Sequence, residues 1–440
     1  MRLMHKVFGA FALLAFAAIT PVAAQTKVTI ATVNNGDMIR MQKLADDFLA
    51  KNPGIQLSWV TLEENALRQK VTTDIATKGG QFDVLTIGTY EVPIWAKQNW
   101  LVPLDNLGAD YDVDDLLKPI RAGLSLNDKL FAAPFYGESS MTMYRRDLFQ
   151  KAGLTMPEKP SWDFIKTAAA KITDKSHEVY GVCLRGKPGW GENAALLTTM
   201  SNAYGGRWFD EKWHPEFTGA EWHNALTAYL DLMQNYGPPG GSSNGFNENL
   251  ALFQSGKCGM WVDATVAASF VSNPKDSKVA DTVGFAPAPC AVTCKNANWL
   301  WSWALAIPTS SKKREAAEKF VAWATSKDYI ALVAAKDGWA NVPPGTRASL
   351  YANAAYTSVS PFAAPTLAAI NSANPGLDGN LKPKPYIGVQ YVAIPEFQGI
   401  ATAVGQQFAA ALTGTTKPDQ ALANAQTLTE REMKKGGYIK

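Results

Sequence analysis

The apolar positions in the first ninety residues alternate between two periods. Residues 27–33, 55–60 and 83–87 are short apolar runs, as expected for buried strands. Between them, apolar side chains recur at helical spacing over 41–49, and 63–77 is predicted as a second helix. This order, with short loops, predicts parallel strand pairing and right-handed crossovers in an α/β sheet.

The carboxyl ends of these strands indicate where a ligand would bind. In parallel α/β sheets, ligands lie just beyond the carboxyl ends of the strands. The polar and aromatic residues expected there are Asn34, Asn35, Glu63, Glu64, Thr89 and Tyr90.

Residues 130–154 have the pattern of a crossing between two lobes. An apolar run, 130–135, leads into a polar break at 136–140 that contains Tyr136 and Glu138. A strand over 141–145 and a short helix closed by Gly153 are predicted to follow. From this stretch alone, a passage of the chain from one lobe into another and an ordinary strand–turn–strand within one large domain both remain open.

Further along the chain, polar and aromatic residues again stand at predicted strand ends. A strand over 180–185 ends at Arg185, and the glycine-rich loop after it contains Trp190. A strand over 258–262 is followed by Asp263, for which a ligand contact and a helix cap remain alternatives.

Residues 298–307 alternate, which places Trp299, Trp301 and Trp303 on one face of a strand. A stripe in the core and a wall of a binding cleft both remain open for these three indoles. Gly338–Pro344, which contains Trp339, is predicted as a further cleft loop.

Composition narrows the function classes. At 440 residues, two domains are expected. The net charge is +3, and it falls to +1 (+3 − 2) without Arg2 and Lys6, so neither nucleic acid nor an anionic membrane is predicted as a partner. Fourteen Trp beside four His favour stacking on the C–H faces of sugars or polyols.

The N-terminus reads as a leader for export. A basic start is followed by an apolar run over 7–19, and small residues at 22–24 form a cleavage pattern. Residues 1–24 are therefore predicted to be a signal peptide, with the mature protein beginning at Gln25 as a soluble periplasmic monomer.

Several motifs carry a family resemblance. They are YRRDLFQKAGL at 144–154, PSWD at 160–163, FQSGKCGM at 253–260 and GWANVPP at 338–344. In this order they resemble the extracytoplasmic solute-binding proteins of carbohydrate ABC transporters. Gly259 and Asp263 depart from the usual Ala and Gly of that pattern.

The resemblance implies an α/β, two-lobed periplasmic binding protein fold of type II. Each lobe would be a mostly parallel sheet flanked by helices, with a hinged cleft between the lobes. The first lobe is expected to comprise 25–134 plus 286–341, and the second 135–285 plus 342–440.

The implied function is delivery of a small neutral solute to a membrane permease, without a cofactor. The Trp-Leu-Trp-Ser-Trp strand and the Arg185 loop look most like the sorbitol/mannitol-binding branch. A di- or oligosaccharide-binding relative, and an exported carbohydrate-active enzyme or lectin, are the alternatives. The predicted ligand-binding residues are Asn34, Asn35, Glu64, Tyr90, Tyr136, Glu138, Arg185, Trp190, Asp263, Trp299, Trp301 and Trp339.

The sequence gives little support for a catalytic site or a metal-binding site. His177, His214 and His223 form no metal-ligating pattern with each other or with Cys. Glu63 or Glu64 with Glu138 could make a glycosidase pair, but no second motif accompanies them. No enzyme activity and no metal site are therefore predicted.

The four cysteines divide into two pairs. Cys290 and Cys294 bracket three residues, which predicts a local disulfide in an exported chain. For Cys183 and Cys258, pairing across the second lobe and two buried thiols both remain possible, and the buried thiols are favoured.

Overall fold

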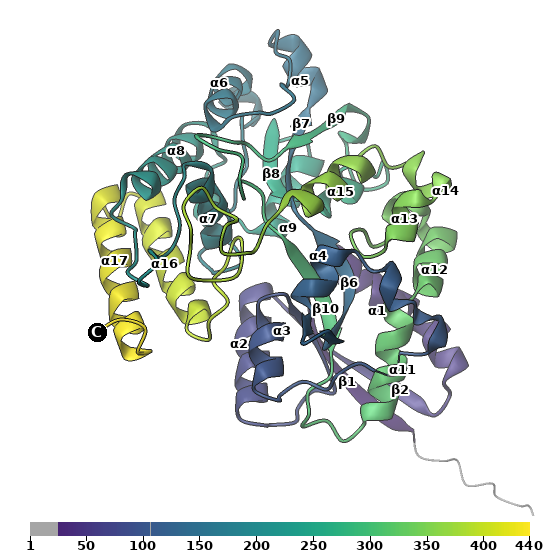
Figure 1. The fold of residues 1–440 in the computed structure, drawn as a ribbon. Helices are drawn as coiled ribbons and strands as arrows, with labels where there is room; N and C mark the ends of the chain where they lie inside the picture. The colour runs from purple at the N-terminus through teal and green to yellow at the C-terminus, as the bar shows by residue number, and fades with distance from the viewer. Residues whose placement is uncertain (1–24, 106) are drawn as a thin grey trace, which may run out of the picture.

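The computed structural model describes residues 25–105 and 107–440, so the predicted signal peptide lies outside the described residues. Two lobes lie one above the other in Figure 1. We call the part built on a five-stranded sheet, in the order β2-β1-β3-β10-β6, the first lobe, and the part built on a three-stranded sheet, β8-β7-β9, the second lobe. The predicted two-lobed α/β architecture is confirmed.

The first sheet follows the predicted strand–helix alternation. Its strands are β1 (Thr26–Val33), β2 (Ile55–Leu62), β3 (Val84–Gly88), β6 (Ala132–Glu138) and β10 (Trp301–Ala306). β1 pairs in parallel with β2 and β3, and α1 (Gly36–Lys51) and α2 (Glu64–Ala76) are the crossovers. β10 runs antiparallel to both β3 and β6.

The second sheet differs from the expected mostly parallel pairing. Its strands, β7 (Ser140–Arg145), β8 (Met260–Ala264) and β9 (Val283–Pro287), pair antiparallel. β7 follows β6 after Ser139 alone, so it carries the chain into the second lobe, whereas β9 carries it back towards β10. These two strands therefore run in opposite directions. The predicted strand at 180–185 makes only isolated parallel bridges, at Tyr180–Cys258 and Cys183–Trp261.

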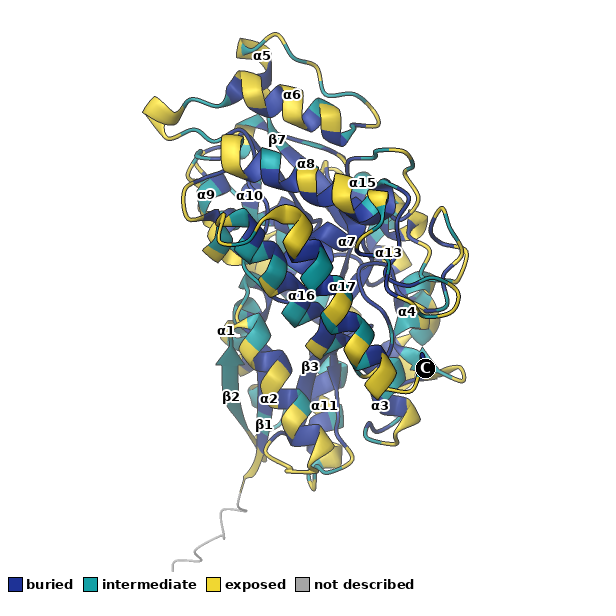
Figure 2. Cartoon of the chain, turned by 90° about the vertical axis from the view of Figure 1, so that its left-hand side faces the viewer, coloured by how far each residue is buried: buried dark blue, intermediate teal, exposed yellow. Residues whose placement is uncertain are grey.

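Helices cover both sheets and form most of the outer surface (Figure 1). After α2, the helices are α3 (Glu91–Lys97), α4 (Lys118–Gly123), α5 (Arg146–Lys151), α6 (Trp162–Ile172), α7 (Asn193–Ala203), α8 (Ala220–Tyr236), α9 (Phe246–Gln254), α10 (Ala267–Val271), α11 (Arg314–Ala324), α12 (Lys327–Asp337), α13 (Ala348–Ala352), α14 (Ala354–Thr357), α15 (Ala363–Ser372), α16 (Phe397–Leu412) and α17 (Pro418–Lys435). Two short strands, β4 (Ser125–Leu126) and β5 (Lys129–Leu130), form a separate hairpin. Figure 2 shows exposed and buried residues alternating along α16 and α17, as on helices that pack one face against a core.

Helix α7 is the buried centre of the second lobe. All of its residues are buried, and none is charged. Its two threonine hydroxyls have internal partners; for example, the Thr198 hydroxyl donates to the Ala194 carbonyl and accepts from the Trp208 indole. Because α7 is packed on every side, it holds the C-terminal end of the preceding loop, 186–192, in a fixed position.

Both cysteine pairs are disulfides. The predicted Cys290–Cys294 bond is confirmed. The favoured prediction for Cys183 and Cys258 is wrong, because these residues also form a disulfide. The parallel bridges at 180–258 and 183–261 bring the two Cα atoms to 5.9 Å, which is within bonding range. Closing this 75-residue separation stabilises the fold by about 4 kcal/mol in the chain-entropy description.

Within the described ranges, no helix combines the length and the apolar character needed to cross a membrane.

Candidate functional site

A small cavity lies between the two lobes, at the carboxyl ends of β1 and β6. Its volume is about 70 Å³. First-lobe elements and second-lobe elements both line it, so it exists as a closed space only when the lobes are together. The lining residues with polar or aromatic side chains are Asn34, Asn35, Glu63, Glu64, Arg68, Tyr136, Glu138, Arg185, Lys187, Trp190, Glu192, Phe246, Asn247, Glu248, Trp299, Trp301, Trp303 and Gln390.

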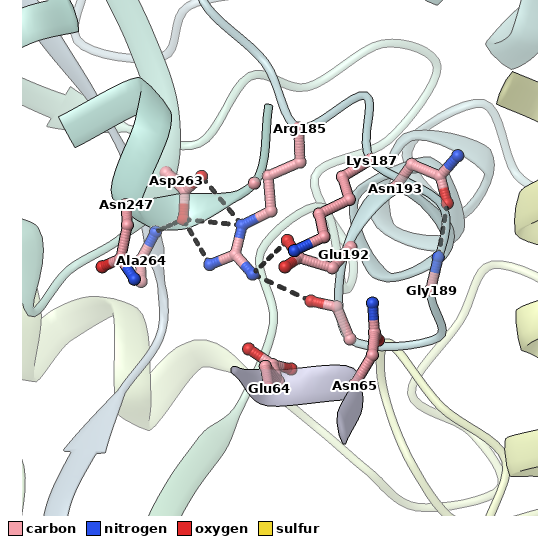
Figure 3. A network of polar contacts seen from close by, with 12 residues as sticks. Glu64, Asn65, Arg185, Lys187, Gly189, Glu192, Asn193, Asn247, Asp263 and Ala264 are labelled. Atoms are coloured by element: carbon pink, nitrogen blue, oxygen red, sulfur yellow. Dashed lines mark hydrogen bonds and ion pairs between the residues drawn. The ribbon is translucent and has the colours of Figure 1, made fainter. Parts of the chain in front are cut away.

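Arg185 is held by carboxylates of the second lobe. Its Nε and Nη2 donate to Asp263 at 3.0 and 2.7 Å, and its Nη1 donates to the Gly191 carbonyl at 2.8 Å and to Glu192 at 3.3 Å. Figure 3 shows Asp263 and Glu192 around the guanidinium, with Glu64 facing them from the first lobe. Burial lowers the pKa of Arg185, but the charges of Asp263, Glu192 and Glu64 and the hydrogen bonds to Asp263 together hold it well above its ordinary value.

Arg68 occupies the opposite wall of the cavity. Its guanidinium donates to Glu64 and to Glu91, both at 2.8 Å. The same group lies 4.0 Å from the ring centroid of Trp190, and Trp301 and Trp303 are at 4.8 and 4.6 Å. A buried guanidinium between indole faces is a strong cation–π arrangement, so Arg68 orders the aromatic wall.

A glycine makes this aromatic wall possible. Trp301 of β10 lies against Gly88, at the end of β3, and a Cβ at position 88 would overlap the indole ring. Trp301 then reaches Trp303 at a centroid distance of 5.4 Å and Trp190 at 5.5 Å, both edge-to-face. The predicted single-face arrangement of Trp299, Trp301 and Trp303 is therefore the cavity wall.

Several polar groups at the cavity have no protein partner. The indole nitrogens of Trp190, Trp299 and Trp301 are buried, and no described residue accepts a hydrogen bond from them. Glu138 is 6 % exposed, and in the described part of the chain no hydrogen bond reaches its carboxyl group. Buried polar groups without partners are rare in folded proteins, so these groups point to a ligand or ordered water.

Two carboxyl groups of the site have raised pKa values. Burial raises the pKa of Glu138 to about 8, against the opposing charge of Arg185. Burial also raises the pKa of Glu192, and Arg185, at 3.3 Å, opposes that shift. Glu138, which has no ion-pair partner in the described part of the chain, therefore stays largely protonated at neutral pH when the cleft is closed.

The two lobes also contact each other directly around the cavity. Lys187 donates to Glu63 at 2.6 Å, and Asn247 donates to the Asn34 carbonyl at 2.9 Å. Within the first lobe, Asn35 donates to the Tyr136 hydroxyl at 2.9 Å and caps α1 through Met38 N–H. These contacts close the rim of the cavity and orient the side chains beneath it.

The structure brings nine of the twelve predicted binding residues to the cavity. They are Asn34, Asn35, Glu64, Tyr136, Glu138, Arg185, Trp190, Trp299 and Trp301. Asp263 does not line the cavity. It lies behind Arg185, fully buried, and also accepts from the Trp261 indole at 3.0 Å, so it positions Arg185.

Tyr90 and Trp339 do not reach the cavity, which corrects their predicted contacts. The Tyr90 hydroxyl donates to the Ile394 carbonyl at 3.0 Å, on the far side of Trp190. Trp339 begins a short 3-10 helix (Trp339–Asn341) after Gly338, whose φ of +91° turns the chain away from the preceding helix α12. Thr89, a further strand-end candidate, is also absent from the lining.

Other cavity residues were not predicted. They are Arg68, Lys187, Glu192, Phe246, Asn247, Glu248 and Gln390. For Arg68 a signal existed, because it follows Glu64 by one helical turn on the predicted helix over 63–77. Gln390 comes from the long segment after α15 and pairs with Leu300 through its amide, which no local pattern indicates.

In the part of the chain that the structure describes, no three His, Cys, Asp or Glu side chains are grouped so that they could hold a metal ion. Two carboxylates that line the cavity, Glu64 and Glu192, instead pair with Arg68 and Arg185.

Comparison with known proteins shows which family this chain belongs to. Residues 35–331 match the family model of the bacterial extracellular solute-binding proteins. The chain is 58 % identical over 413 residues to the mannitol-binding protein of Pseudomonas aeruginosa, with 94 % of each chain covered.

Two solved structures of solute-binding proteins have a similar fold. A solute-binding protein from Agrobacterium vitis S4 with bound D-mannitol is 72 % identical, with a TM-score of 0.93 over 94 % of this chain and 100 % of that one. A second, from Agrobacterium radiobacter K84 in complex with ribitol, is 25 % identical, with a TM-score of 0.80 over 93 % of this chain and 99 % of that one. The chain thus belongs to the bacterial extracellular solute-binding proteins, a family of non-enzymatic binding components of transport systems.

Proposed function

We propose that this protein binds a hexitol such as D-mannitol in the interlobe cavity and delivers it to the permease of an ABC importer. The observation that carries the proposal is the set of unpartnered polar groups at the cavity. Trp190, Trp299, Trp301 and Glu138 all line the cavity, and their three buried indole N–H groups and the Glu138 carboxyl group have no partner among the described residues.

A polyol satisfies this set of groups. Each of its hydroxyls both donates and accepts, so it can accept from an indole N–H while donating to a carboxyl oxygen. The Trp190, Trp299 and Trp301 rings would cover its C–H edges. A neutral ligand is favoured over an anion, because the guanidinium groups of Arg68 and Arg185 already contact carboxylates.

The relatives support the same ligand class. The name of the Pseudomonas aeruginosa relative gives mannitol as its ligand, and the two Agrobacterium structures contain D-mannitol and ribitol, both acyclic polyols. The aromatic wall and the Arg185 loop of this chain supply the polar and apolar surfaces that such ligands need.

A di- or oligosaccharide is the second candidate, and the closed rim weighs against it. The Lys187–Glu63 and Asn247–Asn34 contacts close the rim of the cavity, so a longer ligand could not extend past the rim in this arrangement of the lobes. An open groove would be needed for a longer ligand.

We further propose that ligand binding selects the closed arrangement of the lobes. Only that arrangement offers contacts from both lobes at once, with Glu64 and Tyr136 on one side and Arg185 and Trp190 on the other. The lobes would correspond to the sequence-predicted ranges, 25–134 plus 286–341 and 135–285 plus 342–440. An unchanged radius of gyration at saturating D-mannitol would contradict this closure.

The family indicates where the protein is located in the cell. The chain belongs to the bacterial extracellular solute-binding proteins. We propose that residues 1–24 direct export and are removed, which leaves a periplasmic protein that begins at Gln25. N-terminal sequencing of the protein from a periplasmic extract tests this, and an uncleaved Met1 would contradict it.

Calorimetry at neutral pH tests the ligand. D-mannitol and D-sorbitol should bind with affinities that change little with salt, because the ligand is neutral. Maltose and maltotriose serve as the oligosaccharide arm. Tighter binding of either than of any hexitol would overturn the polyol assignment. Recovery of the polyol unchanged after incubation is expected for a binding protein.

A further inference from the structure

In and behind the walls of the closed cavity, carboxyl groups outnumber the arginines that pair with them. Arg68 contacts Glu64 and Glu91, and Arg185 contacts Asp263 and Glu192. Two positive charges are therefore shared by four carboxylates. Glu138 is a fifth carboxyl group, and it has no cation of its own in the described part of the chain.

The other charged groups near Glu138 do not correct this excess. Asp37 of α1 is buried and pairs with Arg40 at 2.6 Å. Lys187 pairs with Glu63 at the rim, and Glu248 of α9 accepts from Gly245 N–H. Tyr136, on the strand of Glu138, has a pKa raised by burial and stays neutral. Asp263, Glu64 and Asp37 thus all oppose a negative charge on Glu138, and Arg185 favours it.

A neutral ligand brings no charge to offset this excess. An isolated carboxylate in a closed, water-excluding space is costly, and such a group takes up a proton instead. We infer that closing of the cleft on a neutral polyol captures a proton on Glu138, whose carboxyl group then donates a hydrogen bond to a ligand hydroxyl. This inference rests on the proposed function.

The direction of the pH dependence follows from the two states. In an open cleft Glu138 faces water, where its ordinary pKa is 4.5, whereas in the closed cavity burial raises the pKa to about 8. The closed, ligand-bound state therefore holds more protons than the open state. Affinity for D-mannitol should be highest in acid, fall by about tenfold per pH unit between these two values, and level off above the higher one.

Isothermal titration with D-mannitol in two buffers of different ionisation heat measures the proton directly. At neutral pH the wild-type protein should take up about one proton per ligand bound. Glu138→Gln keeps a neutral polar side chain and should lose this uptake, so that its affinity hardly changes with pH. Glu192→Gln tests whether the second buried carboxyl group takes up the proton instead of Glu138. Glu158→Gln, at an exposed position, is the matched control.

Each result decides between the possibilities. Binding of D-mannitol by the wild type without buffer-dependent heat overturns the inference, and this measurement stands even if Glu138→Gln fails to bind. Equal proton uptake in wild type and Glu138→Gln, with loss in Glu192→Gln, also overturns it. Tighter binding of glucamine, a cationic amino-hexitol, than of D-mannitol would show that the ligand supplies the missing charge. Failure of D-mannitol to bind at every pH would instead contradict the proposed function.

Discussion

Arg185 and Arg68 are both buried arginines on the cavity, but they are held in different ways. The hydrogen-bond partners of Arg185, namely Asp263, Glu192 and the Gly191 carbonyl, all lie in the second lobe. Arg68 is hydrogen-bonded within the first lobe, to Glu64 and Glu91, yet its guanidinium also lies 4.0 Å from the Trp190 ring of the second lobe.

This difference indicates that the Arg185 cluster contributes to the folding of the second lobe, whereas the Arg68–Trp190 contact contributes to the closure of the two lobes. The Arg185 cluster forms when the second lobe folds, so it is in place before a ligand arrives. The Arg68–Trp190 contact crosses the cavity, so it exists only when the lobes are together. Changes at the Arg185 cluster should therefore lower the free energy of unfolding, whereas changes at the Arg68–Trp190 contact should mainly lower ligand affinity.

The largest effect is expected for Asp263→Ala. Asp263 is fully buried, and its loss leaves the Arg185 guanidinium buried with an incomplete set of partners. The free energy of unfolding should fall by about 3–5 kcal/mol, measured by chemical denaturation. Asp147→Ala is the matched control, because Asp147 pairs with Arg145 at a partly exposed site and should cost less than about 1 kcal/mol. Equal losses in the two variants would remove the distinction between the arginines.

A smaller effect, on binding, is expected for Trp190→Ala. This change removes the aromatic surface that faces Arg68 across the cavity, together with one indole donor. D-mannitol affinity should fall by about 2 kcal/mol or more, measured by calorimetry. Trp339→Ala is the control, because Trp339 lies outside the cavity lining and should leave the affinity unchanged. A comparable loss in both variants would contradict the proposed role of Trp190.

The smallest effect is expected for Gly36→Ala, at the interlobe contact beside Asn35. A Cβ at position 36 would overlap the ring of Phe270, which α10 of the second lobe places against the start of α1. Closure should be hindered, and D-mannitol affinity should fall by about 1 kcal/mol. Because Ala favours helices over Gly, the free energy of unfolding should not fall. Adding Phe270→Ala should restore affinity, and its failure to do so would exclude the overlap as the cause.

The sequence predicted the local elements closely where the pattern was strong. The helix predicted at 63–77 agrees with α2, and the strands of the first sheet agree within a few residues. It was less successful at 180–185. This segment reads as a strand, but it makes only isolated bridges, which lie along the edge of β8 that β7 leaves free.

Strand ends also predicted most of the cavity, because the carboxyl edge of a parallel sheet is fixed by topology. Asn34, Asn35 and Glu64 follow directly from that rule, and Arg185 and Trp190 from the loop after the bridged segment. Tyr90 satisfies the same rule but turns to the Ile394 carbonyl. Side-chain direction at a strand end depends on what packs there, and in this case the packing partner is about three hundred residues away in the chain.

The sequence alone therefore determined the strand–helix order of the first lobe, the position of the crossing at β6–β7, and the aromatic face of β10, because each depends on spacing within one segment. Only the tertiary structure decided which charges meet. The pairing of Arg68 with Glu91, the placement of Asp263 behind Arg185, the Cys183–Cys258 bond and the isolation of Glu138 all join segments far apart in the chain. Burial of these groups decides which of them are paired, which are protonated and which can bind a ligand. Burial depends on the complete tertiary structure, so no single segment of the sequence determines it.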